Sequence, residues 1–94
     1  MSVDNDQEFF DRADAFLQLA NENCTEDNLG QVTASFMYAA ARFNTWVHAL
    51  GVNSGAELAK DKDKAIAYFL DQYKAMLEEN FEDYADGFDE YMKD

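Results

Sequence analysis

The chain has 94 residues, a formal net charge of −13, and contents of 48% hydrophobic and 15% aromatic residues. This length predicts a single domain with one modest core, too small to enclose a large active-site cavity as well. Binding to nucleic acid or to an anionic membrane requires clustered Lys and Arg, and the net charge here has the opposite sign. We therefore expect neither nucleic acid nor a membrane as a direct partner.

The same composition bears on the cellular compartment. No stretch approaches the roughly 20 apolar residues that span a bilayer, and the first residues are acidic and polar, so we expect no secretory signal. Cys24 is the single cysteine, so no intrachain disulfide can form. An unpaired thiol suits a reducing compartment, which predicts a cytoplasmic protein.

The first predicted helix begins after Asp4 or Asn5, either of which can cap its free amides, with Gln7 or Glu8 completing a capping box. Residues 1–5 are expected to form a disordered N-terminus. The helix is amphipathic and about five turns long. Its apolar stripe comprises Phe9, Ala13, Phe16, Ala20 and Cys24.

The second predicted helix covers residues 31–50, after a turn at residues 25–30 that carries turn-forming side chains. We expect Gly51 to end it as a left-handed cap. Because its other faces are also largely apolar, it is predicted to be the central helix, enclosed by its neighbours. Its predicted core stripe comprises Val32, Phe36, Ala39, Phe43, Trp46 and Leu50.

The third predicted helix opens at Ser54, which forms a capping-box pattern with Glu57. Apolar residues then keep helical spacing as far as Tyr91, too far for one helix to stay packed on the other two. We expect breaks at Asn80 and Gly87, which separate an acidic C-terminal segment, residues 80–94. The prediction is an all-α fold: one domain over residues 1–94, a three-helix bundle with a short C-terminal fourth helix or bent extension.

No residue pattern indicates a catalytic or metal site. His48 is the only histidine and has no Cys, Asp or Glu three or four residues away, so the usual paired metal ligands are missing. Cys24 lies on the inner stripe of its helix without an activating signature, which argues against a thiol dyad with His48. We expect no cofactor and no enzymatic activity.

Arg42 is the only charged residue between Gly30 and Glu57. One reading is structural: the guanidinium pairs with Asp11, Asp14 or a carboxylate of the third helix. The alternative is a ligand site, in which Arg42 holds an anion with Asn44 and His48 as polar neighbours.

Most of the acidic residues lie at the two ends of the chain. Residues 1–30 hold eight acids against one arginine, and residues 78–94 hold eight against one lysine. The C-terminal acids alternate with aromatic residues, a pattern typical of a solvated amphipathic helix or of a docking surface for a basic partner. The candidate docking residues are Phe81, Tyr84, Phe88 and Tyr91.

Several runs of the sequence resemble a family of small bacterial proteins known as domain of unknown function 3144. These are residues 10–14, 32–35, 39–44, 62–65 and 73–80. The likeness covers most of residues 7–92 and includes no catalytic signature. It implies a bacterial, cytosolic protein and supplies no activity, substrate or site residue.

The leading hypothesis is a non-enzymatic interaction protein that binds a basic protein partner or another copy of itself. Its charge polarity and the lack of a recognisable site motivate this reading. One alternative is an anionic small-ligand or enzymatic site around Arg42. Another is an acidic mimic of nucleic acid, although Lys60, Lys62 and Lys64 interrupt the negative surface and argue against it.

Overall fold

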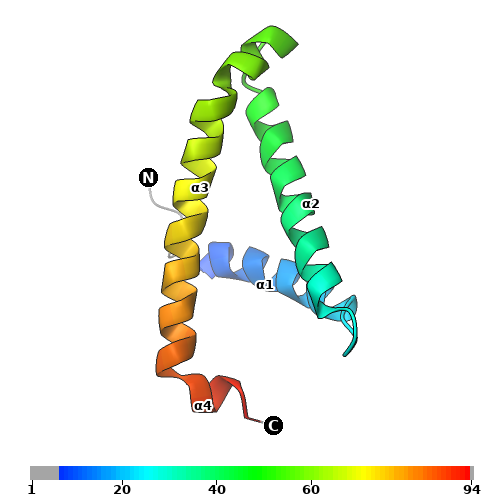
Figure 1. Ribbon diagram of the computed structural model, residues 1–94, viewed down its shortest axis with the longest axis vertical. Helices are drawn as coiled ribbons and strands as arrows, with labels where there is room; N and C mark the ends of the chain where they lie inside the picture. The colour runs from blue at the N-terminus through cyan, green and yellow to red at the C-terminus, as the bar shows by residue number, and fades with distance from the viewer. Residues whose placement is uncertain (1–6, 94) are drawn as a thin grey trace. The chain divides into compact units, whose positions relative to one another are not determined.

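The computed structural model describes residues 7–93, which form four helices and no strand (Figure 1). These are α1 (Gln7–Glu22), α2 (Leu29–Ala49), α3 (Gly55–Asp86) and α4 (Phe88–Tyr91). The predicted all-α class, with three long helices and a short fourth, is confirmed. The predictions of a disordered segment at residues 1–5 and of a cap at Asp4 or Asn5 lie outside the described residues.

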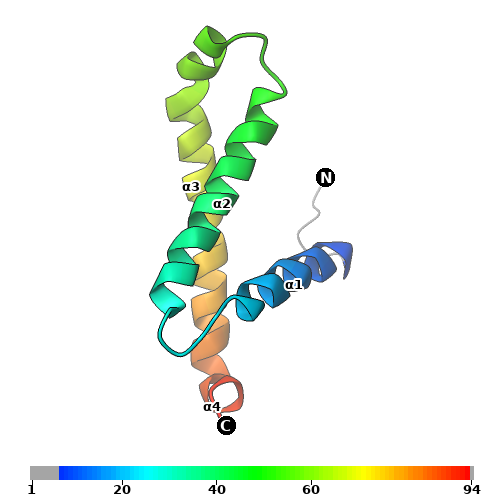
Figure 2. The same ribbon diagram turned by 90° about the vertical axis from the view of Figure 1, so that its right-hand side faces the viewer.

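The chain divides into two units, Met1–Val47 and His48–Asp94, and each is described here by itself. The first unit contains α1 and most of α2, which diverge from the turn that joins them (Figure 2). The second unit contains the end of α2 together with α3 and α4.

The turn between α1 and α2 is held by the side chain of Asn28. Its Oδ1 accepts a hydrogen bond from the Thr25 amide at 2.7 Å, and its Nδ2 donates to the Asn23 carbonyl at 2.9 Å. The Asn28 carbonyl then accepts the first helical bond, from Val32, at 3.0 Å. Because Asn28 takes the capping position, α2 begins at Leu29, two residues earlier than predicted.

The α2–α3 junction confirms one predicted cap and corrects another. The amide of Glu57 donates to Ser54 Oγ at 3.1 Å, and Glu57 Oε1 accepts from the Asn53 amide at 3.0 Å, so the predicted capping box forms. The predicted left-handed conformation of Gly51 is wrong, since no described glycine has a positive φ. Helix α2 instead ends in a tight turn in which the Gly51 amide donates to the His48 carbonyl at 3.0 Å, and such a turn needs no left-handed residue.

Helix α3 continues through Asn80, where the sequence predicted a break. The side-chain amide of Asn80 donates to the Met76 carbonyl at 2.8 Å, so it bonds back onto its own helix and leaves the backbone ladder intact. The second predicted break, at Gly87, is confirmed: α3 ends at Asp86 and α4 begins at Phe88. The short C-terminal fourth helix is therefore four residues long.

None of the described residues is buried, and the apolar stripes are half-buried or exposed. On the predicted core stripe of α2, Val32 is half-buried, whereas Phe43 is 61% and Trp46 56% exposed. This stripe is therefore not a closed core within its unit, because α1 leaves the turn at an angle and covers only the first turns of α2 (Figure 2). Enclosure of α2 as a central helix stays a prediction.

Candidate interaction surfaces

A groove of 750 Å³ lies between α1 and α2 in the first unit. Phe16 on α1 is 60% exposed, and Phe36 and Phe43 line the groove from α2, about two helical turns apart. Leu19 and Val32 line the same groove nearer the turn. The groove is thus an aromatic, largely apolar hollow.

Two of the polar side chains that line this groove, Asn23 and Asn28, are already hydrogen-bonded within the turn. Asn23 Nδ2 donates to the Leu19 carbonyl at 2.9 Å. The side-chain amide of Asn28 accepts a hydrogen bond from the Thr25 amide and donates one to the Asn23 carbonyl. These groups stabilise the turn and have less capacity left for a ligand. The groove therefore offers mainly apolar contact to an occupant.

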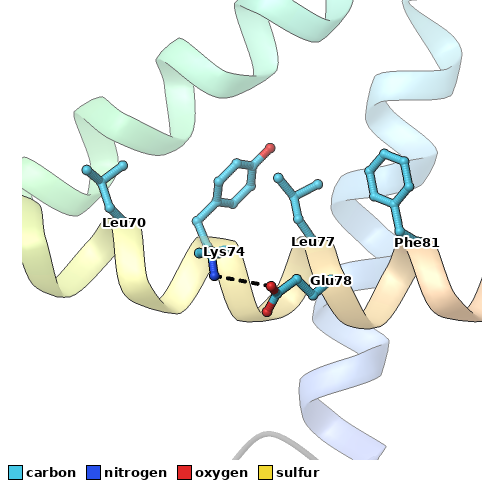
Figure 3. Close-up of a pocket in the computed structure, with 6 residues that line it drawn as sticks. Leu70, Lys74, Leu77, Glu78 and Phe81 are labelled. Carbon is cyan, nitrogen blue, oxygen red and sulfur yellow. Dashed lines mark hydrogen bonds and ion pairs between the residues drawn. The ribbon is translucent and has the colours of Figure 1, made fainter.

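The second surface, which we term the α3 ridge, comprises Leu70, Tyr73, Leu77 and Phe81. Three of these side chains are labelled in Figure 3 and project from the same side of α3, where they border a hollow of 470 Å³. Their exposed fractions run from 40% for Leu77 to 72% for Phe81. The ridge follows from apolar residues three or four positions apart.

An ion pair flanks the α3 ridge. Lys74 Nζ lies 3.2 Å from Glu78 Oε2, one turn further along the helix (Figure 3). Both side chains are more than half exposed, so the pair contributes only a few tenths of a kcal/mol to the helix. Its effect is to place one positive and one negative charge at the rim of an apolar surface.

The four C-terminal aromatic residues predicted to bind a partner divide into two kinds. Tyr84 and Tyr91 stack on each other, with ring centroids 4.3 Å apart and planes inclined by 19°. Phe81 and Phe88 are 72% and 57% exposed. The two tyrosines thus fold α4 back on the end of α3, and the two phenylalanines are the more available for contact.

A hydrogen bond fixes this C-terminal fold. The Tyr91 hydroxyl donates to Asp83 Oδ2 at 2.8 Å. This bond to a carboxylate, together with its negative charge, raises the pKa of Tyr91 above the usual 10.0. Gly87 permits the arrangement, since a Cβ there would lie 3.1 Å from the Tyr91 ring.

Arg42, Asn44 and His48 all lie on α2 but do not share a face. At 3.6 residues per turn, Arg42 is roughly 160° from Asn44 and roughly 120° from His48 around the helix. Arg42 is exposed, forms no ion pair among residues 7–93, and does not line the 750 Å³ groove. Neither Asp11 nor Asp14, which belong to its unit, pairs with it. An anion site at Arg42 stays a prediction.

His48 has a partner that the sequence analysis missed. Its Nε2 lies 3.3 Å from Oδ2 of Asp61, on the second turn of α3, and both side chains are partly exposed. Paired ligands on one helix lie three or four residues apart, whereas Asp61 comes thirteen residues after His48, beyond the turn. The sequence feature that indicates such a contact is a polar residue at the end of an apolar helix, when a second helix begins a few residues later. The contact joins the end of α2 to α3 within the second unit.

Two further features of the described residues concern metals and membranes. Nowhere in residues 7–93 do three or more His, Cys, Asp or Glu side chains gather in a way that would hold a metal ion. Within the same range, no helix combines the length and apolar character that crossing a membrane requires.

These helices and surfaces define a small all-α protein with exposed apolar faces on an acidic chain. The chain belongs to the family DUF3144, described as a protein of unknown function, whose family model matches residues 9–85. The resemblance noted in the sequence is thereby confirmed. The chain is also similar to the protein NB7890A from a Shewanella species, whose structure was solved by NMR. The two share 38% sequence identity over 94% of each chain, with a TM-score of 0.75. No curated protein matches the chain.

Proposed function

We propose that this protein is a non-enzymatic interaction protein whose apolar helix faces bind another protein molecule. The observation that carries the proposal is the α3 ridge, where Leu70 and Phe81 are 63% and 72% exposed. Soluble proteins rarely leave contiguous apolar patches open, and such patches commonly mark interaction sites. The groove between α1 and α2 adds a second apolar surface.

The ridge alone supports a weak association. Covering the exposed parts of four such side chains contributes roughly 4–6 kcal/mol. Association costs roughly 4–15 kcal/mol in lost freedom, so further contacts are needed for a stable complex. The acidic residues at the two ends of the chain supply further contacts if the partner carries positive charge. This favours as partner either a basic protein or a second copy of the chain, through its exposed lysines.

A cytoplasmic location belongs to the same proposal. It is supported by the unpaired, half-buried Cys24, which suits a reducing compartment. Fractionation of the source cell with an antibody against the chain tests it, and recovery outside the cytoplasm would contradict it.

Position-specific photo-cross-linking tests the interaction role. Benzoylphenylalanine introduced at position 81, in place of Phe81, lies on the ridge. The same group at position 79 lies on the opposite side of α3 and serves as the control, since Glu79 is exposed as well. We expect covalent adducts, identified by mass spectrometry, from position 81 and few from position 79.

The adduct mass distinguishes the partners. A mass twice that of the chain identifies a second copy, and any other mass identifies a different protein, whose charge can then be read from its sequence. Absence of adducts at position 81 in the source cell, together with a strictly monomeric purified protein, would overturn the proposal.

A further inference from the structure

We infer that α4 is a latch on the α3 ridge: bent at Gly87 it covers Tyr84, and straightened it adds its own aromatic residues to the ridge. The structure shows the bent form, in which α4 turns away from the axis of α3 (Figure 1). The latch presupposes the proposed interaction role of the ridge. It goes beyond that role because it controls how much of the surface a partner can contact.

The bend centres on one residue. Gly87 has a φ of −106° and a ψ of 26°, whereas a residue inside an α-helix has values of about −63° and −42°. The Glu90 amide donates to the Gly87 carbonyl at 3.0 Å, three residues back rather than the four of a continuous helix. Rotations of roughly 70° in ψ and 40° in φ at Gly87 therefore join α3 and α4 into one straight helix.

Two contacts hold the bent form. The rings of Tyr84 and Tyr91 stack with their centroids 4.3 Å apart, and the Tyr91 hydroxyl donates to Asp83 Oδ2 at 2.8 Å. The stack requires the bend, because seven residues of straight helix advance roughly 10.5 Å and helical side chains all lean toward the N-terminus. All three residues are exposed. Contacts of these two kinds each shift an equilibrium only about two- to tenfold, so the latch can open.

The apolar spacing of α3 continues through the bend. The aromatic residues at positions 84, 88 and 91 lie seven, eleven and fourteen residues beyond Leu77. In a straight helix, all three would lie within roughly 40° of the direction of Leu77 around the axis. They would therefore continue the α3 ridge. The sequence thus carries the apolar face of a longer helix, while the structure shows that helix bent.

The bent form shortens the surface that a partner can contact. Tyr91 lies against Tyr84, the next apolar position beyond the ridge. Because α4 leaves the axis of α3, Phe88 is no longer in line with the ridge (Figure 1). A partner that covers the whole straight ridge must first open the latch. Its apparent Kd then rises in inverse proportion to the open fraction.

Two substitutions should open the latch. Alanine is favoured over glycine inside a helix by roughly fivefold, and in the bent form the Cβ of Gly87→Ala would lie 3.1 Å from the Tyr91 ring. Tyr91→Phe keeps the ring, removes the bond to Asp83, and shifts the equilibrium about two- to tenfold in the same direction. Gly55→Ala is the matched control on α3, because a Cβ there meets no atom within 4 Å.

Distances between two spin labels, measured by pulsed electron resonance on the full chain, test the latch. The labels are attached in a Cys24→Ser background at Asp71→Cys and Glu90→Cys, both of which are exposed positions. Positions 71 and 90 are roughly 28 Å apart along a straight helix and closer together in the bent form. We expect mainly the shorter distance in the original chain and in Gly55→Ala.

The open fraction should rise about fivefold or more in Gly87→Ala, and further when Tyr91→Phe is added. An unchanged short distance in this double variant would overturn the latch.

Photo-cross-linking separates the latch from the proposed function. With benzoylphenylalanine at position 81, Gly87→Ala should raise the yield of adducts in proportion to the open fraction while the partner is not saturating, and Gly55→Ala should not. Equal yields from these two variants, with the labels showing α4 open in Gly87→Ala, would overturn the control of binding and leave the proposed function standing. Absence of adducts from every variant and from the original chain would overturn the proposed function, and the control of binding with it.

Discussion

Replacing Leu70 with Ala measures directly whether the α3 ridge is a surface. The substitution removes three carbons, and full burial of three methylene equivalents is worth roughly 2.4 kcal/mol. Because Leu70 is 63% exposed, only about a third of this burial energy is lost, so the free energy of unfolding should fall by roughly 0.9 kcal/mol. A buried leucine in a closed core would lose about 2–5 kcal/mol.

The assay is urea and thermal unfolding followed by circular dichroism, at a concentration too low for association. For a domain of this size, a loss of 0.9 kcal/mol lowers Tm by about 4–7 °C. Leu58→Ala is the matched control on the same helix. Because Leu58 is half-buried, this substitution should lower the free energy of unfolding more than Leu70→Ala does. A Leu70→Ala loss of 3 kcal/mol or more would refute the reasoning, because it would show a closed core at this position.

Three further predictions concern the ends of α3. Ser54→Ala removes the acceptor of the Glu57 amide and lowers the free energy of unfolding by about 1 kcal/mol in urea titrations, while Ser54→Asp retains it. Ultraviolet titration should show a tyrosine ionisation above the usual range, because the bond to Asp83 raises the pKa of Tyr91. Because the pKa of Tyr91 is raised in the folded chain, its bond to Asp83 stabilises the C-terminal fold below about pH 10. That stabilisation is lost as pH rises through the pKa of Tyr91, and Tyr91→Phe removes the late step. Gly87→Ala places a Cβ 3.1 Å from the Tyr91 ring and should weaken the stack with Tyr84, seen as smaller NMR ring-current shifts.

Each of these three predictions has a result that would contradict it. An unchanged urea midpoint in Ser54→Ala would show that the cap contributes nothing. A late ionisation that persists in Tyr91→Phe would assign it to another tyrosine. Ring-current shifts in Gly87→Ala equal to those of the original chain would show that the ring adapts without cost.

The sequence predicted those features whose causes are local. Ser54 and Glu57 are three residues apart, and Gly87 interrupts an otherwise continuous pattern, so both junctions are readable from neighbouring residues. Asn80 was misjudged because the same amide that can end a helix can also bond back to it. Whether it does so depends on its rotamer, which the sequence does not reveal.

The interaction surfaces were harder to predict because exposure depends on how helices diverge. The stripe through Phe36 and Phe43 has the same spacing whether it faces a core or a groove. The contact of His48 with Asp61 depends on how the chain turns between two helices. Among the four aromatic residues predicted to bind a partner, sequence spacing does not distinguish the stacked pair from the exposed pair. Tyr84 and Tyr91 stack, whereas Phe81 and Phe88 are exposed.

The order of charges along α3 opposes the dipole of its own backbone. A helix favours acids near its N-terminus and cations near its C-terminus. Here Glu57 meets that preference in the first turn, but the last turn holds no cation and contains Asp83 and Asp86. Added salt screens this repulsion, so the C-terminal turns of α3 should fray less as ionic strength rises, even as ion pairs between molecules weaken. Salt thus acts in opposite directions on the folding of this helix and on the proposed binding of a positively charged partner.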